Sequence, residues 1–173
     1  MEQDILWAPW RIGYVQGIDQ DKKCFICHYQ QNPQNDTENL VLWRTGSSIV
    51  ILNRFPYNNG HLLIAPVRHI AELAQASDPE LLDMTRLIRE AQKALSLTIK
   101  PHGFNVGMNF GRCAGAGLPG HLHIHIVPRW DGDTNFMSAC SRTKVISQSL
   151  AELLEQLKET SKVHNLPDLK ENP

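Results

Sequence analysis

The sequence predicts an α+β domain with an antiparallel sheet of about five strands and two main helices. Three short apolar segments come first, then a long amphipathic pattern, then two strand-like segments and a second amphipathic pattern. Strands grouped around interposed helices in this way are typical of α+β folds. The chain has 173 residues, of which 42% are hydrophobic and 20% charged. These values suit one globular domain with a sizeable core, so we take 1–173 as a single domain.

The first three strands are expected in the largely apolar segments Leu40–Arg44, Ser48–Leu52 and His61–Pro66. A Thr-Gly-Ser turn at 45–47 favours a hairpin of the first two strands, and a proline ends the third. Two segments rich in Asn and interrupted by proline are expected to be loops: 29–38 and 53–60.

The first long helix should begin at Ser77. Ser77 can cap the helix, Glu80 completes a capping box with it, and Pro79 stands in the first turn. Apolar residues then recur at helical spacing as far as Leu95. We therefore expect this helix to reach about Thr98.

The second half of the chain supplies the remaining elements. Phe104–Phe110 alternates like a strand, and a glycine-rich loop at 111–120 leads into a further alternating segment. Leucines at helical spacing mark a second helix: Leu150, Leu153, Leu154 and Leu157. Dense aromatic residues in 1–23 predict an N-terminal extension that packs on the domain, and the polar residues 162–173 predict a frayed tail.

Composition argues against several classes of protein. The net charge of −1 offers no basic excess for a nucleic acid or a membrane surface. No apolar run approaches the roughly 18 residues that a membrane-spanning helix needs. The segment Met1–Asp4 is acidic and no apolar signal-peptide segment follows it, so we expect a cytoplasmic protein.

The most informative local pattern is Gly120–Pro128, in which histidine alternates with apolar residues. Side chains on a strand alternate between its two faces, so His121, His123 and His125 should share one face. Imidazole titrates near neutral pH and serves as a nucleophile, a proton shuttle or a metal ligand. Two interpretations stay open at this point: histidines that converge on a metal ion, or a nucleophilic histidine flanked by helpers.

The cysteines give a second, weaker signal. Cys24 and Cys27 have the spacing of a metal knuckle, which is compatible with zinc, with a redox pair or with neither. The βαβ context of a thioredoxin-like pair is missing, and a disulfide framework is not expected in a cytosolic chain. Cys113 and Cys140 carry no local signature, and we interpret them as structural or incidental.

The segment His121–Val127 matches His-φ-His-φ-His-φ-φ, where φ is apolar, and so resembles the histidine-triad (HIT) superfamily. Asn53–Arg54 together with Gly60–Pro66 is similar to the first signature block of that superfamily. The resemblance therefore covers about residues 24–136. Three further segments resemble bacterial HIT enzymes that phosphorolyse diadenosine tetraphosphate: Leu6–Arg11, Pro101–Gly107 and Pro128–Phe136.

The resemblance implies a nucleotidyl transferase or hydrolase of the HIT fold. His123 would attack the α-phosphate of a nucleotide and form a covalent nucleotidyl-histidine. His125 and His61 would supply hydrogen-bond donors beside that phosphate. The amide of Asn109 would steady the nucleophile or the phosphate, and Asn53 would bind the ribose hydroxyls.

HIT proteins that carry a CxxC motif also bind zinc. In this chain the resemblance assigns the metal to Cys24, Cys27, His69 and His121, a closed Cys2His2 set and hence a structural Zn²⁺ site. His28, next to Cys27, is a rival ligand. The resemblance implies no organic cofactor.

One departure from the family pattern concerns the leaving group. Many HIT proteins carry Gln-Ser or Gln-Thr shortly before the triad, whereas Ala116–Pro119 offers no hydroxyl here. We expect the backbone N–H groups of Gly117 and Leu118 to contact anionic oxygens instead. Arg129 and Lys144 are candidates to neutralise the distal phosphates.

We therefore expect cleavage of a dinucleoside polyphosphate, diadenosine tetraphosphate above all, through a His123–AMP intermediate. Phosphate as the acceptor would give ADP and ATP, and water would give AMP and ATP. The alternatives are a hydrolase of AMP–amine conjugates, a non-catalytic nucleotide-binding protein, and a metal-dependent enzyme or metal-binding module that uses all three triad histidines. By resemblance to the family we expect a homodimer, with no nucleic-acid or membrane partner.

Overall fold

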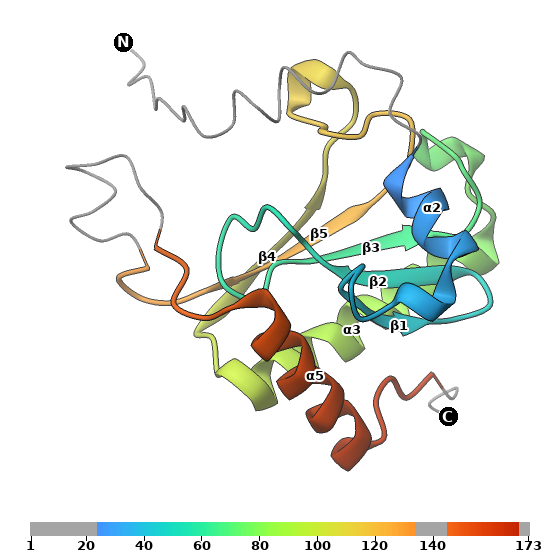
Figure 1. The fold of residues 1–173 in the computed structure, drawn as a ribbon. Helices are drawn as coiled ribbons and strands as arrows, with labels where there is room; N and C mark the ends of the chain where they lie inside the picture. Colours follow the sequence, from blue (N-terminus) through green and yellow to red (C-terminus); the bar gives the residue numbers. More distant parts are fainter. Residues whose placement is uncertain (1–23, 134–144, 170–173) are drawn as a thin grey trace, which may run out of the picture.

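The computed structural model describes residues 24–133 and 145–169, whose strands form one antiparallel sheet (Figure 1). The spatial order is β1-β2-β3-β5-β4. The strands are β1 (Val41–Arg44), β2 (Ser48–Leu52), β3 (Leu62–Pro66), β4 (Gly103–Met108) and β5 (Ile124–Arg129). The helices are α2 (Phe25–Gln31), α3 (Asp78–Ile99) and α5 (Leu150–His164). The expected N-terminal extension, Cys140 and Lys144 lie outside the described residues.

The α+β class, the five strands and the two main helices are confirmed. Strands β1 and β2 form the expected hairpin, in which the Ser48 backbone N–H donates to Thr45 Oγ1 over 2.8 Å. Helix α3 begins with the capping box of Ser77 and Glu80. It ends at Ile99, one residue beyond the expected end, where Lys100 takes the left-handed conformation (φ 48°).

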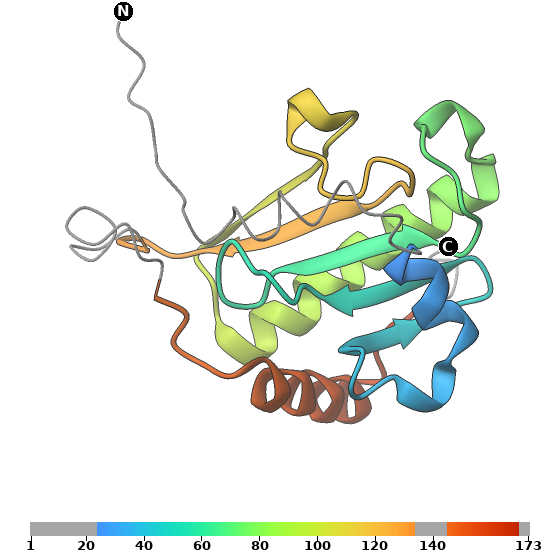
Figure 2. The ribbon, with the colours of Figure 1, turned by 45° about the horizontal axis from the view of Figure 1, so that its top comes forward.

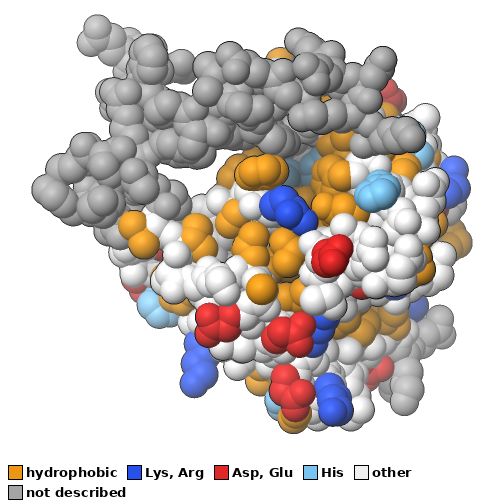
Figure 3. All heavy atoms as spheres, viewed as in Figure 1, with side chains coloured by type: hydrophobic (Ala, Val, Ile, Leu, Met, Phe, Trp, Pro, Cys, Tyr) orange, Lys and Arg blue, Asp and Glu red, His pale blue; other side chains and the backbone are white. Residues whose placement is uncertain are grey.

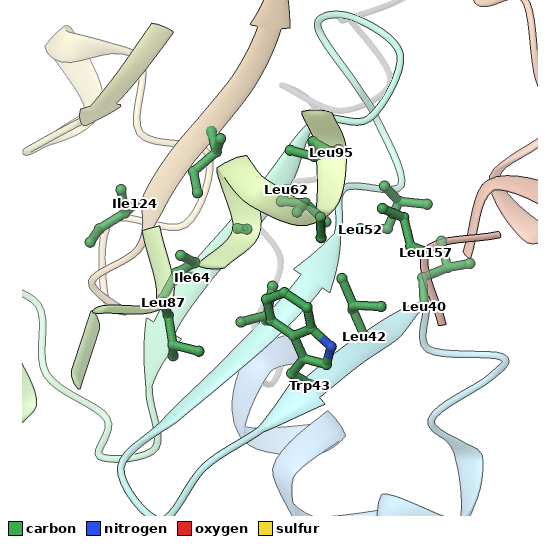
Figure 4. Packing of buried hydrophobic residues seen from close by; sticks show 14 of the residues in the cluster. Leu40, Leu42, Trp43, Leu52, Leu62, Ile64, Leu87, Leu95, Ile124 and Leu157 are labelled. Atoms are coloured by element: carbon green, nitrogen blue, oxygen red, sulfur yellow. The ribbon is translucent and has the colours of Figure 1, made fainter. Parts of the chain in front are cut away.

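Helices α3 and α5 cover one face of the sheet (Figures 1 and 2). Alternate strand residues point toward these helices, because side chains on a strand alternate between faces. Figure 4 shows this core, in which Ile64 of β3 lies near Leu87 of α3, and Leu62 lies near Leu95 of the same helix. Each such buried side chain contributes roughly 1.5–3 kcal/mol to the free energy of unfolding.

The intervening strand residues point to the opposite face, on which α2 packs. Ile49, Ile51 and Leu63 form a second apolar cluster there with Ile26, the fully buried residue of α2. In the β3–β5 pair, Leu63 lies opposite His125. The histidines therefore project from the α2 face of the sheet, while Ile124 and Ile126 belong to the core beneath α3.

Helix α5 continues through His164, three residues into the segment expected to be a frayed tail. The Trp43 indole N–H donates to the buried Ser161 hydroxyl over 3.1 Å, which links α5 to β1. Leu166 is also buried, and its N–H donates to the Ser161 carbonyl over 2.8 Å.

Two sequence-based expectations need correction. Residues 29–38 are not all loop, since α2 extends to Gln31 and a short 3-10 helix spans Pro33–Asn35. The histidine segment is extended only in part, because β5 begins at Ile124 and the first two triad histidines precede it. None of the helices in the described part of the chain is long and apolar enough to cross a membrane.

Candidate active site and metal-binding cluster

Three histidines form a row on the α2 face of the sheet. His61 directly precedes β3, and its Nε2 lies 2.9 Å from Nδ1 of His125 on the neighbouring β5. The rings of His125 and His123 follow, with centroids 4.9 Å apart in an edge-on arrangement. His61 and His123 are buried and His125 is half-buried. The pairing of β3 with β5 thus brings residues distant in sequence into one cluster.

The hydrogen bonds of this row have a direction. The Tyr57 backbone N–H donates to His61 Nδ1 over 3.0 Å, and Asn53 Nδ2 lies 3.2 Å from the same nitrogen. In the neutral ring the proton of His61 is therefore on Nε2, which donates to His125 Nδ1. The proton of His125 consequently lies on Nε2, where the ring can donate to a ligand.

Burial keeps this row uncharged at neutral pH. Burial first and the neighbouring imidazoles second lower the pKa of His61 to about 3 and that of His125 to about 4. Burial also lowers the pKa of His123. A neutral imidazole retains the lone pair that a nucleophile or a hydrogen-bond acceptor needs.

The orientation of His123 is fixed by the chain two residues upstream. His123 Nδ1 lies 2.7 Å from the carbonyl oxygen of His121, so Nδ1–H donates to that oxygen. The lone pair of the neutral ring is then on Nε2. This tautomer is the one that a nucleophilic Nε2 requires.

A cavity of about 600 Å³ lies beside His123 and His125. On the face seen in Figure 3, hydrophobic side chains gather over the middle of the sheet next to a histidine. The volume falls within the usual range for small-molecule sites, roughly 300–1,000 Å³. The other lining residues are Phe25, Tyr29, Asn39, Ile51, Leu52, Asn53, Arg54, Phe55, Pro56, Tyr57, Leu63, Gly117, Leu118 and Ile146.

Most of the predicted substrate-site residues meet at this cavity. Asn53, Gly117 and Leu118 line it. Asn109 Nδ2 lies 3.5 Å from His125 Nε2, at the edge of the histidine row.

Arg129 is placed elsewhere, at the far end of β5. Its Nε and Nη2 pair with the Asp133 carboxylate at 2.6 and 3.0 Å, and its Nη1 donates to Asn105 Oδ1 over 2.7 Å. It is not among the residues that line the cavity.

The aromatic walls of the cavity were not predicted from the sequence. Phe25 and Tyr29 come from α2, and Tyr57 stacks on His125 with ring centroids 5.7 Å apart. A helical interpretation of the CxxC segment would have placed Phe25 and Tyr29 on one face, because residues four apart are neighbours on a helix. Arg54, a cationic residue of the lining, was also not singled out.

The four predicted metal ligands form a cluster. The ligand atoms of Cys24, Cys27, His69 and His121 lie within 4.8 Å of one another. Cys24 Sγ is 3.1 Å from His121 Nδ1, and Cys27 Sγ is 3.2 Å from His69 Nδ1. Two thiols and two imidazoles are the donor set that tetrahedral Zn²⁺ prefers.

The cluster also has the outer hydrogen bond that metal sites use. His121 Nε2–H donates to the Pro66 carbonyl over 2.9 Å, which leaves Nδ1 with its lone pair facing the sulfurs. The residues present therefore fit a metal ion. The rival ligand His28 is not part of the cluster, and its Nδ1 lies 3.3 Å from Asn32 Nδ2. Because His121 faces the cysteines, the three triad histidines do not converge on one point.

Known proteins of one family are similar to this chain. The model of the HIT domain matches residues 32–132. The AP-4-A phosphorylase of Mycobacterium tuberculosis is 38% identical over 153 residues, which cover 85% of this chain and 78% of that protein. The adenosine 5'-monophosphoramidase hnt1 of Schizosaccharomyces pombe is 30% identical over 60% of this chain and 74% of that protein.

The chain belongs to the HIT family. A solved structure, a Zn-bound histidine triad family protein from Mycobacterium smegmatis, shares the fold with a TM-score of 0.67. It is 21% identical and the match covers 83% of this chain and 96% of that one. Both relatives compared by sequence are enzymes, a phosphorylase and a phosphoramidase.

Proposed function

We propose that the protein is a nucleotidyl transferase that cleaves diadenosine tetraphosphate by phosphorolysis. The observation that carries the proposal is His123, which is neutral, buried and held as the Nδ1–H tautomer at the wall of a nucleotide-sized cavity. The 38% identity to the AP-4-A phosphorylase of M. tuberculosis supports this choice of substrate.

In the first step His123 Nε2 attacks the α-phosphorus of the bound dinucleotide. The Nε2–P bond forms, the bond from this phosphorus to the bridging oxygen breaks, and ATP leaves with that electron pair. Two chemically easier displacements thereby replace one difficult displacement. Asn53 at the cavity wall would bind the ribose hydroxyls.

His125 assists by hydrogen bonding. Its Nε2–H is directed by the bond that His61 donates to its Nδ1, so it can donate to an oxygen of the reacting phosphate. The backbone N–H groups of Gly117 and Leu118 and the amide of Asn109 would contact the other anionic oxygens. We keep Lys144 and Arg129 as candidate contacts for the distal phosphates, although Arg129 would first have to leave Asp133.

In the second step inorganic phosphate attacks the same phosphorus. The P–Nε2 bond breaks, its electron pair returns to His123, and ADP is released. Water in place of phosphate would give AMP. A second candidate substrate is an AMP–amine conjugate, because the same intermediate forms when the leaving group is an amine. The similarity to a monophosphoramidase favours testing it.

We also propose that the Cys24, Cys27, His69 and His121 cluster holds a structural Zn²⁺, since a HIT protein of the same fold is Zn-bound. When bound, the ion would link α2 to the histidine segment and take no part in the reaction. One zinc per purified chain, measured by mass spectrometry of the metal, is the expected result. A protein free of zinc would contradict it.

We propose a homodimer and a cytoplasmic location as well. Among the described strands β4 is an edge strand, and Val106 on it is 43% exposed, so another copy could pair there. Light scattering should give the mass of two chains, and the mass of one chain would reject the dimer. The cytoplasmic location depends on the sequence alone.

Incubation with diadenosine tetraphosphate, with and without phosphate, tests the function. We expect ADP and ATP only when phosphate is present, and an AMP adduct on the intact protein by mass spectrometry when phosphate is omitted. His123→Ala should abolish both, whereas His102→Ala, at an exposed histidine away from the cavity, should change neither. AMP and ATP regardless of phosphate would identify a hydrolase. No adduct and no turnover would reject the proposed nucleophile.

A further inference from the structure

We propose that the metal cluster positions both sides of the nucleotide pocket, so that zinc and a nucleoside monophosphate bind cooperatively. The inference depends on the proposed function and the proposed zinc. It concerns the residues that connect the cluster to the cavity, Phe25 and Tyr29 on one side and His121 on the other.

The first connection is α2. Cys24 is the N-cap of this helix and Cys27 lies in its first turn, so two of the four ligands hold its N-terminal end. Phe25 and Tyr29 of the same helix line the cavity and pack edge to face, with ring centroids 5.4 Å apart. Any movement of Cys24 and Cys27 would therefore move the side of the cavity that Phe25 and Tyr29 form.

Helix α2 depends on a few anchors outside the cluster. It has seven residues and its N-cap forms no side-chain cap hydrogen bond. So short a helix is unstable alone, and its position is set by tertiary contacts. Ile26 is buried beneath it, and Arg44 Nη2 donates to the Tyr29 carbonyl over 2.8 Å at its C-terminal end. The cluster would fix the other end.

The second connection is His121. Its Nδ1 faces the two sulfurs, and its backbone carbonyl accepts the 2.7 Å hydrogen bond from His123 Nδ1. One residue thus contacts the metal cluster through its side chain and orients the nucleophile through its backbone. Without the metal, the hydrogen bond from His121 Nε2 to the Pro66 carbonyl would remain as an anchor of this side chain.

Cooperative binding follows from these two connections. A nucleotide that packs against Phe25 and Tyr29 keeps α2 in the position in which Cys24 and Cys27 can bind the metal. The metal in turn keeps Phe25 and Tyr29 in the position in which they contact the nucleotide. Linkage requires both effects to have the same size. We expect a factor of at least about 5, the lower end of the usual range for coupled sites.

The test uses AMP as the probe and equilibrium binding as the readout. The affinity for AMP is measured by calorimetry on zinc-loaded and chelator-stripped protein, and the affinity for zinc by chelator competition with and without AMP. Both affinities should change by the same factor. His69→Asn, which removes an exposed ligand outside α2, should weaken AMP binding as stripping does. His28→Asn is the matched control, because His28 is exposed on α2 and outside the cluster.

Phe25→Ala gives a second test, since it keeps all four ligands. The gain in zinc affinity upon adding AMP should largely disappear in this variant. AMP binding that is independent of zinc would reject the coupling and leave the proposed function intact. A zinc-loaded protein that does not bind AMP would reject both. If circular dichroism shows that the stripped protein unfolds, the cluster stabilises the whole domain and the local positioning role is wrong.

Discussion

His61 and His125, 64 residues apart in sequence, share a hydrogen bond of 2.9 Å whose direction is set by the Tyr57 backbone N–H. The amide donates to His61, His61 donates to His125, and the remaining N–H of His125 faces the position beside Asn109. A loop backbone thus determines which nitrogen of His125 is a donor. The low pKa values of His61 and His125 preserve this sequence of donors and acceptors, because a protonated imidazole has no acceptor nitrogen.

The first prediction concerns His125→Ala. Loss of a positioned donor to the reacting phosphate should lower kcat about 10²- to 10⁴-fold. AMP affinity should change much less, because the apolar walls and Asn53 remain. Steady-state kinetics with diadenosine tetraphosphate and phosphate measure the first quantity, and calorimetry the second. A kcat within a factor of three of the unaltered enzyme would show that His125 is not needed for chemistry.

The second prediction concerns stability and pH. The pKa of His61 is about 3 in the fold, against about 6.5 in an unfolded chain. Below pH 6.5 the unfolded chain therefore binds a proton that the folded chain does not. The contribution of neutral His61 to the free energy of unfolding is therefore fully present above about pH 6.5. It is lost as pH falls toward 3, by up to about 1.4 kcal/mol per pH unit.

Urea unfolding between pH 7 and 5 measures this slope. His61→Gln should reduce this slope, with His125 and His123 responsible for what remains, whereas His28→Gln, at an exposed position, should leave it unchanged. Glu80 belongs to a different pH range, because its pKa is lowered to about 2 by the hydrogen bond from Arg68, and its contribution is lost only below about pH 4.5. An unchanged slope in His61→Gln would mean that His61 is not held neutral in the fold.

The sequence predicted the elements whose local signals agree with their packing. Helix α3 has a capping box, a proline in the first turn and a continuous apolar stripe, and both its ends were placed within a residue. The hairpin of β1 and β2 was equally clear, because turn residues separate two short apolar segments.

Helix α2 could not be predicted in the same way. Its residues Phe, Ile, Cys, His and Tyr all have modest helix propensity. Cys24 is not one of the residue types that usually cap a helix. Its helical state depends on Ile26 in the second apolar cluster and on Arg44 at its far end. The role of Tyr57 was hidden for a similar reason, since it orients His61 through a backbone hydrogen bond that no side-chain pattern reports.

The third prediction concerns Gly60→Ala. Gly60 precedes His61 with φ of +75°, and an added Cβ would lie 2.6 Å from Ile99 Cδ1 and 2.9 Å from Leu95 Cδ2. Strain and overpacking should together lower the free energy of unfolding by about 2–4 kcal/mol. Gly111→Ala is the matched control, because its φ is +78° but nothing lies within 4 Å of the added Cβ.

Gly111→Ala should cost only about 1–2 kcal/mol, the part due to backbone conformation. Thermal and urea unfolding of both variants measure the difference. Equal decreases in the free energy of unfolding would show that the side chains of α3 make room for the added Cβ at no cost. The positive φ alone would then explain the glycine at position 60.

The fourth prediction concerns Asn58, which connects the loop before His61 to the end of β5. Its side-chain N–H groups donate to the Pro128 carbonyl and to Asp133 Oδ2, both over 2.9 Å, and the residue is 6% exposed. Asn58→Ala leaves the carbonyl without this partner, so the free energy of unfolding should fall by about 1–3 kcal/mol. The same change loosens the loop that carries the Tyr57 N–H, so kcat should fall while AMP affinity is largely retained.

Asn59→Ala is the neighbouring control, because its amide makes one long contact of 3.4 Å to Gln148. It should change the unfolding free energy by less than about 1 kcal/mol and leave kcat unaltered. If Asn58→Ala lowered stability but left kcat unchanged, the direction of the His61–His125 bond would not depend on this loop, and the adjacent Asn53 amide would be sufficient to set it.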